Sequence, residues 1–190
     1  MPTPGTSRYA SAAMTLHWTI ALLIVIQLCL GWYMNEVLPD HSSAQAAVVT
    51  IHVSVGLTIL LLVLVRIGIR LAMPPPPPPA GLQPWERALS ASVHGMFYVL
   101  MLVLPLTGWA LVSVHKGPID FWGIPWPKLP GLGALAADKA SRHTLQHVHV
   151  YWLIWIIVAS WVLHVAGALK HQFDGHPVLY RMVPFLKRPA

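Results

Sequence analysis

Charged side chains are scarce in this chain. Of its 190 residues, 12 are Lys or Arg and 6 are Asp or Glu, whereas 56% of the residues are hydrophobic. Soluble globular domains usually carry about 25% charged residues, so this composition does not suit one. Acidic residues are missing altogether from four long apolar stretches. The chain is therefore expected to be an integral membrane protein with the lipid bilayer as its surroundings.

Cysteine is almost absent as well. The one cysteine, Cys29, lies inside an apolar run, so no disulfide framework can form. The motif Cys-x-x-Cys-His does not occur, which excludes covalent attachment of a c-type heme. The net charge of +6 could indicate a nucleic-acid partner, but the basic residues do not gather on a polar, soluble segment. We therefore expect no nucleic-acid binding and interpret the charge as a signal of membrane topology.

Four apolar stretches are long enough to cross a bilayer as helices. They cover about residues 15–34, 48–71, 89–114 and 147–170. We predict an all-α integral membrane protein, with residues 1–190 forming a single four-transmembrane-helix bundle. Six consecutive prolines, 74–79, cannot be helical and predict a stiff spacer between the second and third stretches. The longest connection, 115–142, is rich in Pro and Gly and is expected to carry a short helix at about 132–142.

Four spans place both termini on the same side of the membrane. The terminal tails and the connection between the second and third stretches, with the adjoining helix ends, hold eight basic residues. They are Arg8, Arg66, Arg70, Arg87, Lys170, Arg181, Lys187 and Arg188. The opposite side holds four basic residues, all in the 115–142 loop. Because positive residues favour the cytoplasmic side, both termini are expected in the cytoplasm and this loop outside.

Four histidines lie near the ends of the apolar stretches, two at each depth. His149 and His164 are fifteen residues apart on the fourth stretch. In a helix this separates them by ~22 Å along the axis and leaves them within about 60° of one face. His17 begins the first stretch on the inner side, and His52 begins the second on the outer side. Since imidazole is costly in hydrocarbon without a partner, the pattern predicts an inner pair and an outer pair. These are His17 with His164, and His52 with His149.

Two imidazole pairs that join different helices suit axial ligation of two hemes in a four-helix bundle. A proton or metal transporter and purely structural hydrogen bonding are the alternatives. The transporter is disfavoured because the spans contain no Asp or Glu. On the fourth stretch, His147 remains an alternative to His149, because it lies only two residues away. Its angular offset from His164, about 100°, is the less favourable of the two.

Several motifs resemble the bacterial cytochrome b561 family, in particular its superoxide oxidase type. They are Met14-Thr-Leu-His17-Trp18, Ile51-His52-Val-Ser-Val-Gly56, Arg66 closing the second stretch, His94 with Leu104-Pro105-Leu-Thr-Gly108, Leu163-His164-Val-Ala-Gly-Ala-Leu-Lys-His171, and Val178-Leu-Tyr-Arg181-Met-Val-Pro184. The resemblance covers nearly the whole chain. It implies a bacterial inner-membrane protein with two b hemes, and as their axial ligands His17 with His164, and His52 with a histidine early in the fourth helix.

One spacing departs from the family pattern. The family usually places the two ligands of its fourth helix fourteen residues apart, and position 150 here is Val. His149 is therefore one residue out of register. Either the fourth helix contains a local bulge, or the outer ligand on this helix is another residue.

The resemblance also implies substrates. Members of the superoxide oxidase type relay electrons from superoxide, on the periplasmic side, to ubiquinone. The outer loop has four basic residues against two acidic ones, which leaves it at +2 and could steer a small anion. The basic residues are Lys116, Lys128, Lys139 and Arg142, and the acidic ones are Asp120 and Asp138.

Other candidate residues belong to the inner side. His94 and His171 could bind the quinone and supply protons, because histidine serves as both hydrogen-bond donor and acid. Arg66 and Arg70 could pair with heme propionates, since arginine suits carboxylates. The sequence thus predicts a membrane oxidoreductase that transfers electrons between superoxide and ubiquinone. An electron-transfer subunit for a partner dehydrogenase and a heme-free transporter are the other functions considered.

Overall fold

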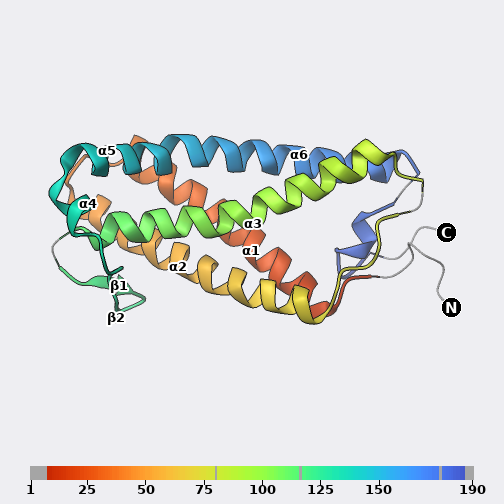
Figure 1. Ribbon diagram of the computed structural model, residues 1–190, viewed down its shortest axis with the longest axis horizontal. Helices are drawn as coiled ribbons and strands as arrows, with labels where there is room; N and C mark the ends of the chain where they lie inside the picture. Colours follow the sequence, from red (N-terminus) through yellow and green to blue (C-terminus); the bar gives the residue numbers. More distant parts are fainter. Residues whose placement is uncertain (1–7, 80, 116, 176, 187–190) are drawn as a thin grey trace.

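Four long helices run the length of the molecule in this computed structural model (Figure 1). The structure describes residues 8–79, 81–115, 117–175 and 177–186. The first three helices are α1 (Ser11–Glu36), α2 (Ser43–Ala72) and α3 (Pro84–Ser113). The fourth is continuous but composite, made of α5 (Lys139–His147), the π-helix η1 (Val148–Leu153) and α6 (Ile154–Phe173). Each is long and apolar enough to cross a membrane, which confirms the predicted four-helix membrane bundle.

The helices extend beyond the apolar stretches because polar caps start them outside the hydrocarbon. The hydroxyl of Ser42 accepts a hydrogen bond from the backbone N–H of Gln45 at 3.1 Å and caps α2. At the start of α3, the side chains of Gln83 and Glu86 bond each other's backbone N–H groups reciprocally. Hydropathy reports only the part of a helix that lies in lipid, so these first turns lie outside the predicted spans.

The apolar core lies among α1, α2 and α3. Its centre consists of Ile20, Val55, Ile59, Val63 and Met101. The three α2 residues are spaced by four, so they form one stripe on that helix. Close backbone packing joins α1 to α2, α2 to α3, and α3 to α6. In the described part of the chain, α1 with α6 and α2 with η1 are not among the closely packed pairs.

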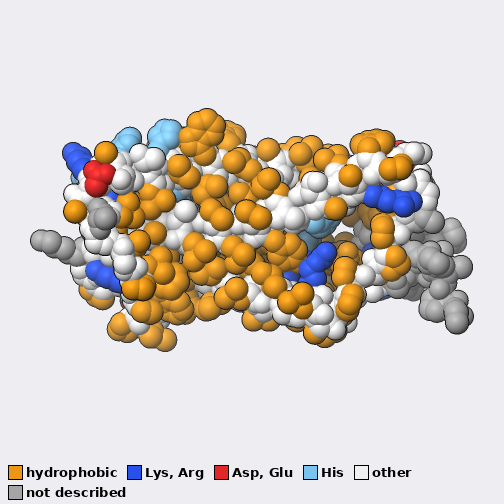
Figure 2. All heavy atoms as spheres, in the orientation of Figure 1, with side chains coloured by type: hydrophobic (Ala, Val, Ile, Leu, Met, Phe, Trp, Pro, Cys, Tyr) orange, Lys and Arg blue, Asp and Glu red, His pale blue; other side chains and the backbone are white. Residues whose placement is uncertain are grey.

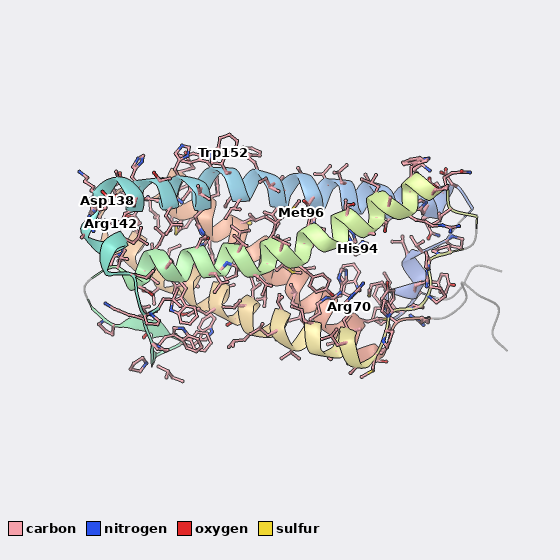
Figure 3. The ribbon with its side chains drawn as sticks, viewed as in Figure 1. Arg70, His94, Met96, Asp138, Arg142 and Trp152 are labelled. Atoms are coloured by element: carbon pink, nitrogen blue, oxygen red, sulfur yellow. The ribbon has the colours of Figure 1, made fainter. Side chains whose placement is uncertain are left out.

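Large apolar side chains also cover the outside of the bundle. Leu71 and Trp155 are 78% and 70% exposed. Figure 2 shows hydrophobic side chains over the middle of the visible face, and Figure 3 shows Trp152 projecting from it. A soluble protein rarely exposes apolar surface on this scale, so lipid is the natural cover for these side chains.

A two-stranded hairpin, which the sequence did not predict, lies against α2. β1 (Ile119–Phe121) pairs antiparallel with β2 (Ile124–Trp126). On α2, the hydroxyl of Ser54 donates to the carbonyl of Asp120 at 3.3 Å and accepts from the N–H of Trp122 at 3.2 Å. Strands of three residues, one of which contains a proline, show too little alternation to be predicted.

The last part of this loop is helical. α4 (Gly133–Ala137) is followed at once by α5, over the region in which one short helix was expected. We call the end of the bundle that carries this loop and the hairpin the outer end.

The segment that follows α6 closes the opposite end. It contains the 3₁₀ turn η2 (Leu179–Arg181). Arg8 donates to the carbonyl of Val183 at 2.6 Å, and Arg181 donates to the carbonyl of Pro77 in the non-helical proline run, also at 2.6 Å. These bonds tie the C-terminal segment to the N-terminal residues and to the proline run. We call this end, where both ends of the described chain meet, the inner end.

Candidate cofactor-binding site

One histidine pair bridges α1 and α6 toward the inner end. The ring centres of His17 and His164 lie 6.1 Å apart, with their planes at 59°. Phe97 of α3 contacts His164 edge-on at 5.5 Å between ring centres. The two residues that the sequence placed at the inner depth therefore meet across the bundle, from helices that are not closely packed.

A second pair bridges α2 and η1 toward the outer end. The ring centres of His52 and His149 lie 6.4 Å apart, with their planes at 77°. Two glycines leave space for these rings. A Cβ at Gly31 of α1 would lie 3.5 Å from Cε1 of His52, and a Cβ at Gly108 of α3 would lie 3.2 Å from Cε1 of His149. The second contact is tight enough that a side chain at Gly108 would push on the ring.

The spacing within each pair suits a metal ion between two imidazoles. Metal–nitrogen bonds to histidine are ~2.0–2.1 Å long, and the ring centre lies ~1.1 Å behind the bonding nitrogen, so two rings on opposite sides of one ion stand roughly 6.3 Å apart. The measured separations of 6.1 and 6.4 Å agree with this value. Within the described residues no cluster of three or more His, Cys, Asp or Glu could hold a bare ion. Two ligands alone fit iron whose other positions are filled by a porphyrin.

Two buried polar atoms near the outer pair have no hydrogen-bond partner within the described residues. His52 Nδ1 is buried and, as far as the structure describes the chain, accepts and donates no hydrogen bond. Gln27 Oε1 on α1 is also buried and has no partner among the described residues, while Gln27 Nε2 donates to the backbone carbonyl of His52 at 3.0 Å. Leaving a buried polar atom unpaired costs free energy, so the His52 side of the outer pair is less well satisfied by protein groups than the His149 side.

The fourth helix contains a local bulge, which was one of the two explanations considered for the spacing of its histidines. η1, residues Val148–Leu153, is a π-helix and includes His149. A π turn bonds residue i to i+5 and so accommodates one extra residue. Fifteen residues then occupy about the turns of fourteen, which leaves His149 and His164 roughly 40° apart around the helix rather than about 60°. The shifted spacing is therefore compatible with His149 as a ligand.

The ring of His147 has different neighbours from the ring of His149. The His147 ring lies 4.6 Å from that of Tyr151 and 6.4 Å from that of His143, between ring centres. The same three residues line a polar pocket with Asn35 at the outer end. The ring that lies opposite His52 is that of His149. The geometry thus favours His149 over its alternative.

His94 lies closer to the inner pair than the sequence suggested. Its ring centre is 5.1 Å from that of His164, with the planes nearly perpendicular. Its Nδ1 lies 2.6 Å from the backbone carbonyl of Ser90, which leaves Nε2 free of that bond. The inner site therefore has three histidines, contributed by α1, α3 and α6.

The two candidate arginines lie on the same end of α2. Arg66 donates to the carbonyl of Ala13 on α1 at 3.0 Å. The guanidinium of Arg70 lies over the ring of Tyr98 on α3, 5.6 Å from its centre. Figure 3 shows Arg70 and His94 on the same side of the bundle, and Figure 2 shows a hollow beside Lys and Arg side chains at this place. This hollow opens between α2 and α3.

His171 lies in the last turn of α6, seven residues beyond His164 and thus about 10 Å further along the axis. Its neighbour Lys170 forms ion pairs with Glu86 and with Asp174, each at 2.7 Å. The pair with Glu86 joins α3 to the end of α6, and the pair with Asp174 lies within that end. His171 therefore belongs to the inner surface rather than to the inner pair.

The basic residues of the outer loop lie at the outer end, as far as they can be described. Lys139 and Arg142 are in α5, and Lys128 Nζ donates to the carbonyl of His115 at 2.6 Å. Figure 3 shows Arg142 at this end of the molecule. Lys116 lies outside the described residues.

The two acidic residues of this loop are engaged in local hydrogen bonds. Asp120 Oδ1 accepts from the N–H of Gly123 at 2.9 Å. Asp138 caps α5 and accepts from the hydroxyl and the N–H of Ser141. These bonds, the hydroxyl first, hold the pKa of Asp138 below its ordinary value, so this carboxylate remains ionised near neutral pH.

Three residues that contact the outer pair were not among the predicted site residues. Thr107 Oγ1 lies 2.8 Å from His149 Nδ1, and Gly31 and Gly108 border the two rings. Thr107 and Gly108 stand in a motif that carried the family resemblance, but the motif gave them no role. Gly31 had no distinguishing signal, because a glycine in an apolar helix reveals its neighbour only in three dimensions.

Two comparisons relate the chain to known proteins. A family model described as prokaryotic cytochrome b561 matches residues 8–185. The chain is 27% identical over 177 residues to cytochrome b561 homolog 2 of Escherichia coli (strain K12), and the match covers 93% of this chain and 91% of that protein.

Proposed function

Because the chain belongs to the prokaryotic cytochrome b561 family, and is thus a transmembrane b-type cytochrome of electron transfer, we propose that it binds two b hemes and oxidises superoxide with ubiquinone as the acceptor. The observation that carries the proposal is the presence of two imidazole pairs, each with the spacing of axial ligands, toward opposite ends of one bundle.

In this proposal the protein orients the cofactors and excludes water. When bound, a b heme would supply one-electron redox chemistry. His17 and His164 would hold the inner group, and His52 and His149 the outer one. Because His149 and His164 share one continuous helix, the separation of the two sites is fixed by that helix at ~22 Å along its axis.

Superoxide would react at the outer end. Two superoxide ions give up one electron each and become dioxygen, and one ubiquinone takes up both electrons and two protons to become the quinol. Lys128, Lys139 and Arg142 make the outer end attractive to a small anion. Asp120 and Asp138 offset part of this charge, but their oxygens are directed to backbone and hydroxyl donors.

The quinone would bind at the inner end. The ring of His94 lies next to the inner pair. The hollow between α2 and α3 would open this site to lipid, from which a quinone would arrive. Histidine can hydrogen-bond a quinone carbonyl and pass it a proton. His171, at the inner surface, would renew that proton from water. Arg66 and Arg70 are the candidate partners for heme propionates on this side.

Stopped-flow spectroscopy tests the proposed reaction. Oxidised protein is mixed with superoxide, with and without superoxide dismutase, and then with a short-chain ubiquinone. We expect reduced b-type bands that dismutase abolishes and quinone reoxidises. Bands that superoxide fails to produce, but that a co-purifying dehydrogenase produces with its own substrate, would establish the electron-transfer subunit instead.

A further inference from the structure

The outer histidine of the fourth helix has a specific hydrogen-bond partner on α3. Thr107 Oγ1 lies 2.8 Å from His149 Nδ1, across a separation of 42 residues in the chain. The carbonyl of Leu104 is a second acceptor beside the same ring. Gly108, the next residue, lets the ring lie close against the α3 backbone. Three neighbouring positions of one helix therefore define where this imidazole can sit.

The direction of the bond follows from the hydrogens available. The hydroxyl of Thr107 has a single hydrogen, and its oxygen lies 2.9 Å from each of two acceptors, the carbonyls of Val103 and Leu104. When that hydrogen donates to either carbonyl, the oxygen accepts toward His149. The proton of the neutral ring must then be on Nδ1, because a neutral imidazole carries one N–H. Nε2 is left with a free lone pair, which is the form that binds metal.

We propose that Thr107 is a positioning residue that fixes His149 as the Nδ1–H tautomer and tunes the outer heme through this bond. The inference rests on the proposed function, in which His149 is an axial ligand. A hydrogen bond from the distal N–H makes a ligating imidazole more electron-donating, which stabilises the oxidised metal. His52, whose Nδ1 has no partner within the described residues, lacks this support. The two proposed ligands of the outer heme therefore differ in the hydrogen bonding of their Nδ1 atoms.

The test compares three variants of the holoprotein purified with its hemes. Thr107→Val keeps the side-chain shape and removes the acceptor, whereas Thr107→Ser keeps the acceptor. Thr50→Val is the matched control, because Thr50 makes the same bond to the carbonyl four residues back, and within the described residues its hydroxyl has no hydrogen bond to a histidine. Redox titration and low-temperature EPR of the oxidised protein are the readouts, and the inner heme of each sample serves as an internal reference for folding.

We expect Thr107→Val to raise the midpoint potential of the outer heme only, to change its EPR g-values, and to weaken its binding on the order of 10-fold. Leu104 still offers an acceptor, so both hemes should remain bound at purification. Thr107→Ser and Thr50→Val should match the wild type. An outer heme with unchanged potential and g-values in Thr107→Val would overturn the inference.

A separate measurement distinguishes this failure from failure of the proposed ligand set. His149→Ala should lose the outer heme, whereas His147→Ala should keep it. Full heme retention in His149→Ala would refute the ligand assignment itself. Loss in His149→Ala together with an unchanged Thr107→Val would refute only the role of Thr107.

Discussion

An imidazole inside a lipid-facing bundle needs a partner for its nitrogens. In this chain each of the four half-buried rings of the two pairs faces a second ring about 6 Å away, and neither pair includes a carboxylate. Direct hydrogen bonding between two rings would bring their centres closer than this. At the scale of single residues, the distance therefore favours a bridging ion over a proton relay.

His164→Ala and His52→Ala should each remove one axial ligand of a different iron. We expect the first variant to lose the inner heme and the second to lose the outer heme, with the remaining heme unchanged. Redox titration resolves the two components, and His41→Ala, in an exposed loop, is the control. Loss of the same spectral component in both variants would refute the pairing.

Gly108→Ala should reduce occupancy of the outer site. Its Cβ would lie 3.2 Å from His149 Cε1, so the ring or the helix must move by a few tenths of an ångström. Gly95→Ala, on the same helix, meets nothing within 4 Å and should stabilise α3 by up to about 1 kcal/mol. Heme content of the two variants checks the prediction, and equal heme content would show that Gly108 is not a spacer for the ring.

At the scale of elements, the π-helix η1 explains how two histidines fifteen residues apart can both face the interior of the bundle. His149 lies one residue out of the spacing expected for its family, and η1 takes up one residue within the same helix. The bulge thus lets His149 reach His52 while His164, fifteen residues later, reaches His17.

Deletion of Val150 should convert the π turn into regular α-helix and preserve both hemes, because the remaining spacing of fourteen keeps the two ligands on one face. Insertion of one alanine after Val150 is the matched control, because it lengthens the spacing between His149 and His164 instead of shortening it. It rotates His149 by ~100° with no bulge left to absorb it, so the outer heme should be lost and the inner one kept. The heme content of both variants is the measurement. If the deletion lowers the heme content as much as the insertion does, η1 does not have this role.

Several elements could be predicted from the sequence because their signals are local. Hydropathy gave the four spans, and the depth of each histidine followed from its distance to a span end. The π-helix has no residue signature, and the hairpin is held by Ser54 and Trp122 through contacts that only the fold brings together. The contact of His94 with His164 depends on how far α3 is rotated against α6, which spacing along one helix cannot reveal.

At the scale of the whole molecule, charge is arranged by end. The middle of the bundle is apolar, and the basic residues gather at the two ends, with a positive loop at the outer end (Figure 2). Exposed charges act over a Debye length of ~8 Å at physiological salt, so the loop can affect encounter rates but not the buried rings. In the proposed function, binding of the hemes would depend on the histidines, and capture of the anion would depend on the loop.

Replacing Lys116, Lys128, Lys139 and Arg142 together by Gln should slow reduction by superoxide and flatten its dependence on salt. The heme spectra should be unchanged, because none of these residues is assigned to iron. Arg142→Gln and Arg87→Gln form a matched pair of single changes at the outer and inner ends, and only the first should alter the rate. Stopped-flow mixing at two ionic strengths gives the result, and an unaltered salt slope would mean that the loop does not steer the donor.

Heme stoichiometry tests the central claim most directly. Acid–acetone extraction of the purified protein, followed by quantitation of heme per polypeptide, measures both the number of hemes and the nature of their attachment. Two histidine pairs and the absence of a Cys-x-x-Cys-His motif predict two b hemes per chain, both released by the solvent. One heme per chain, or heme that stays attached to the protein, would contradict the account.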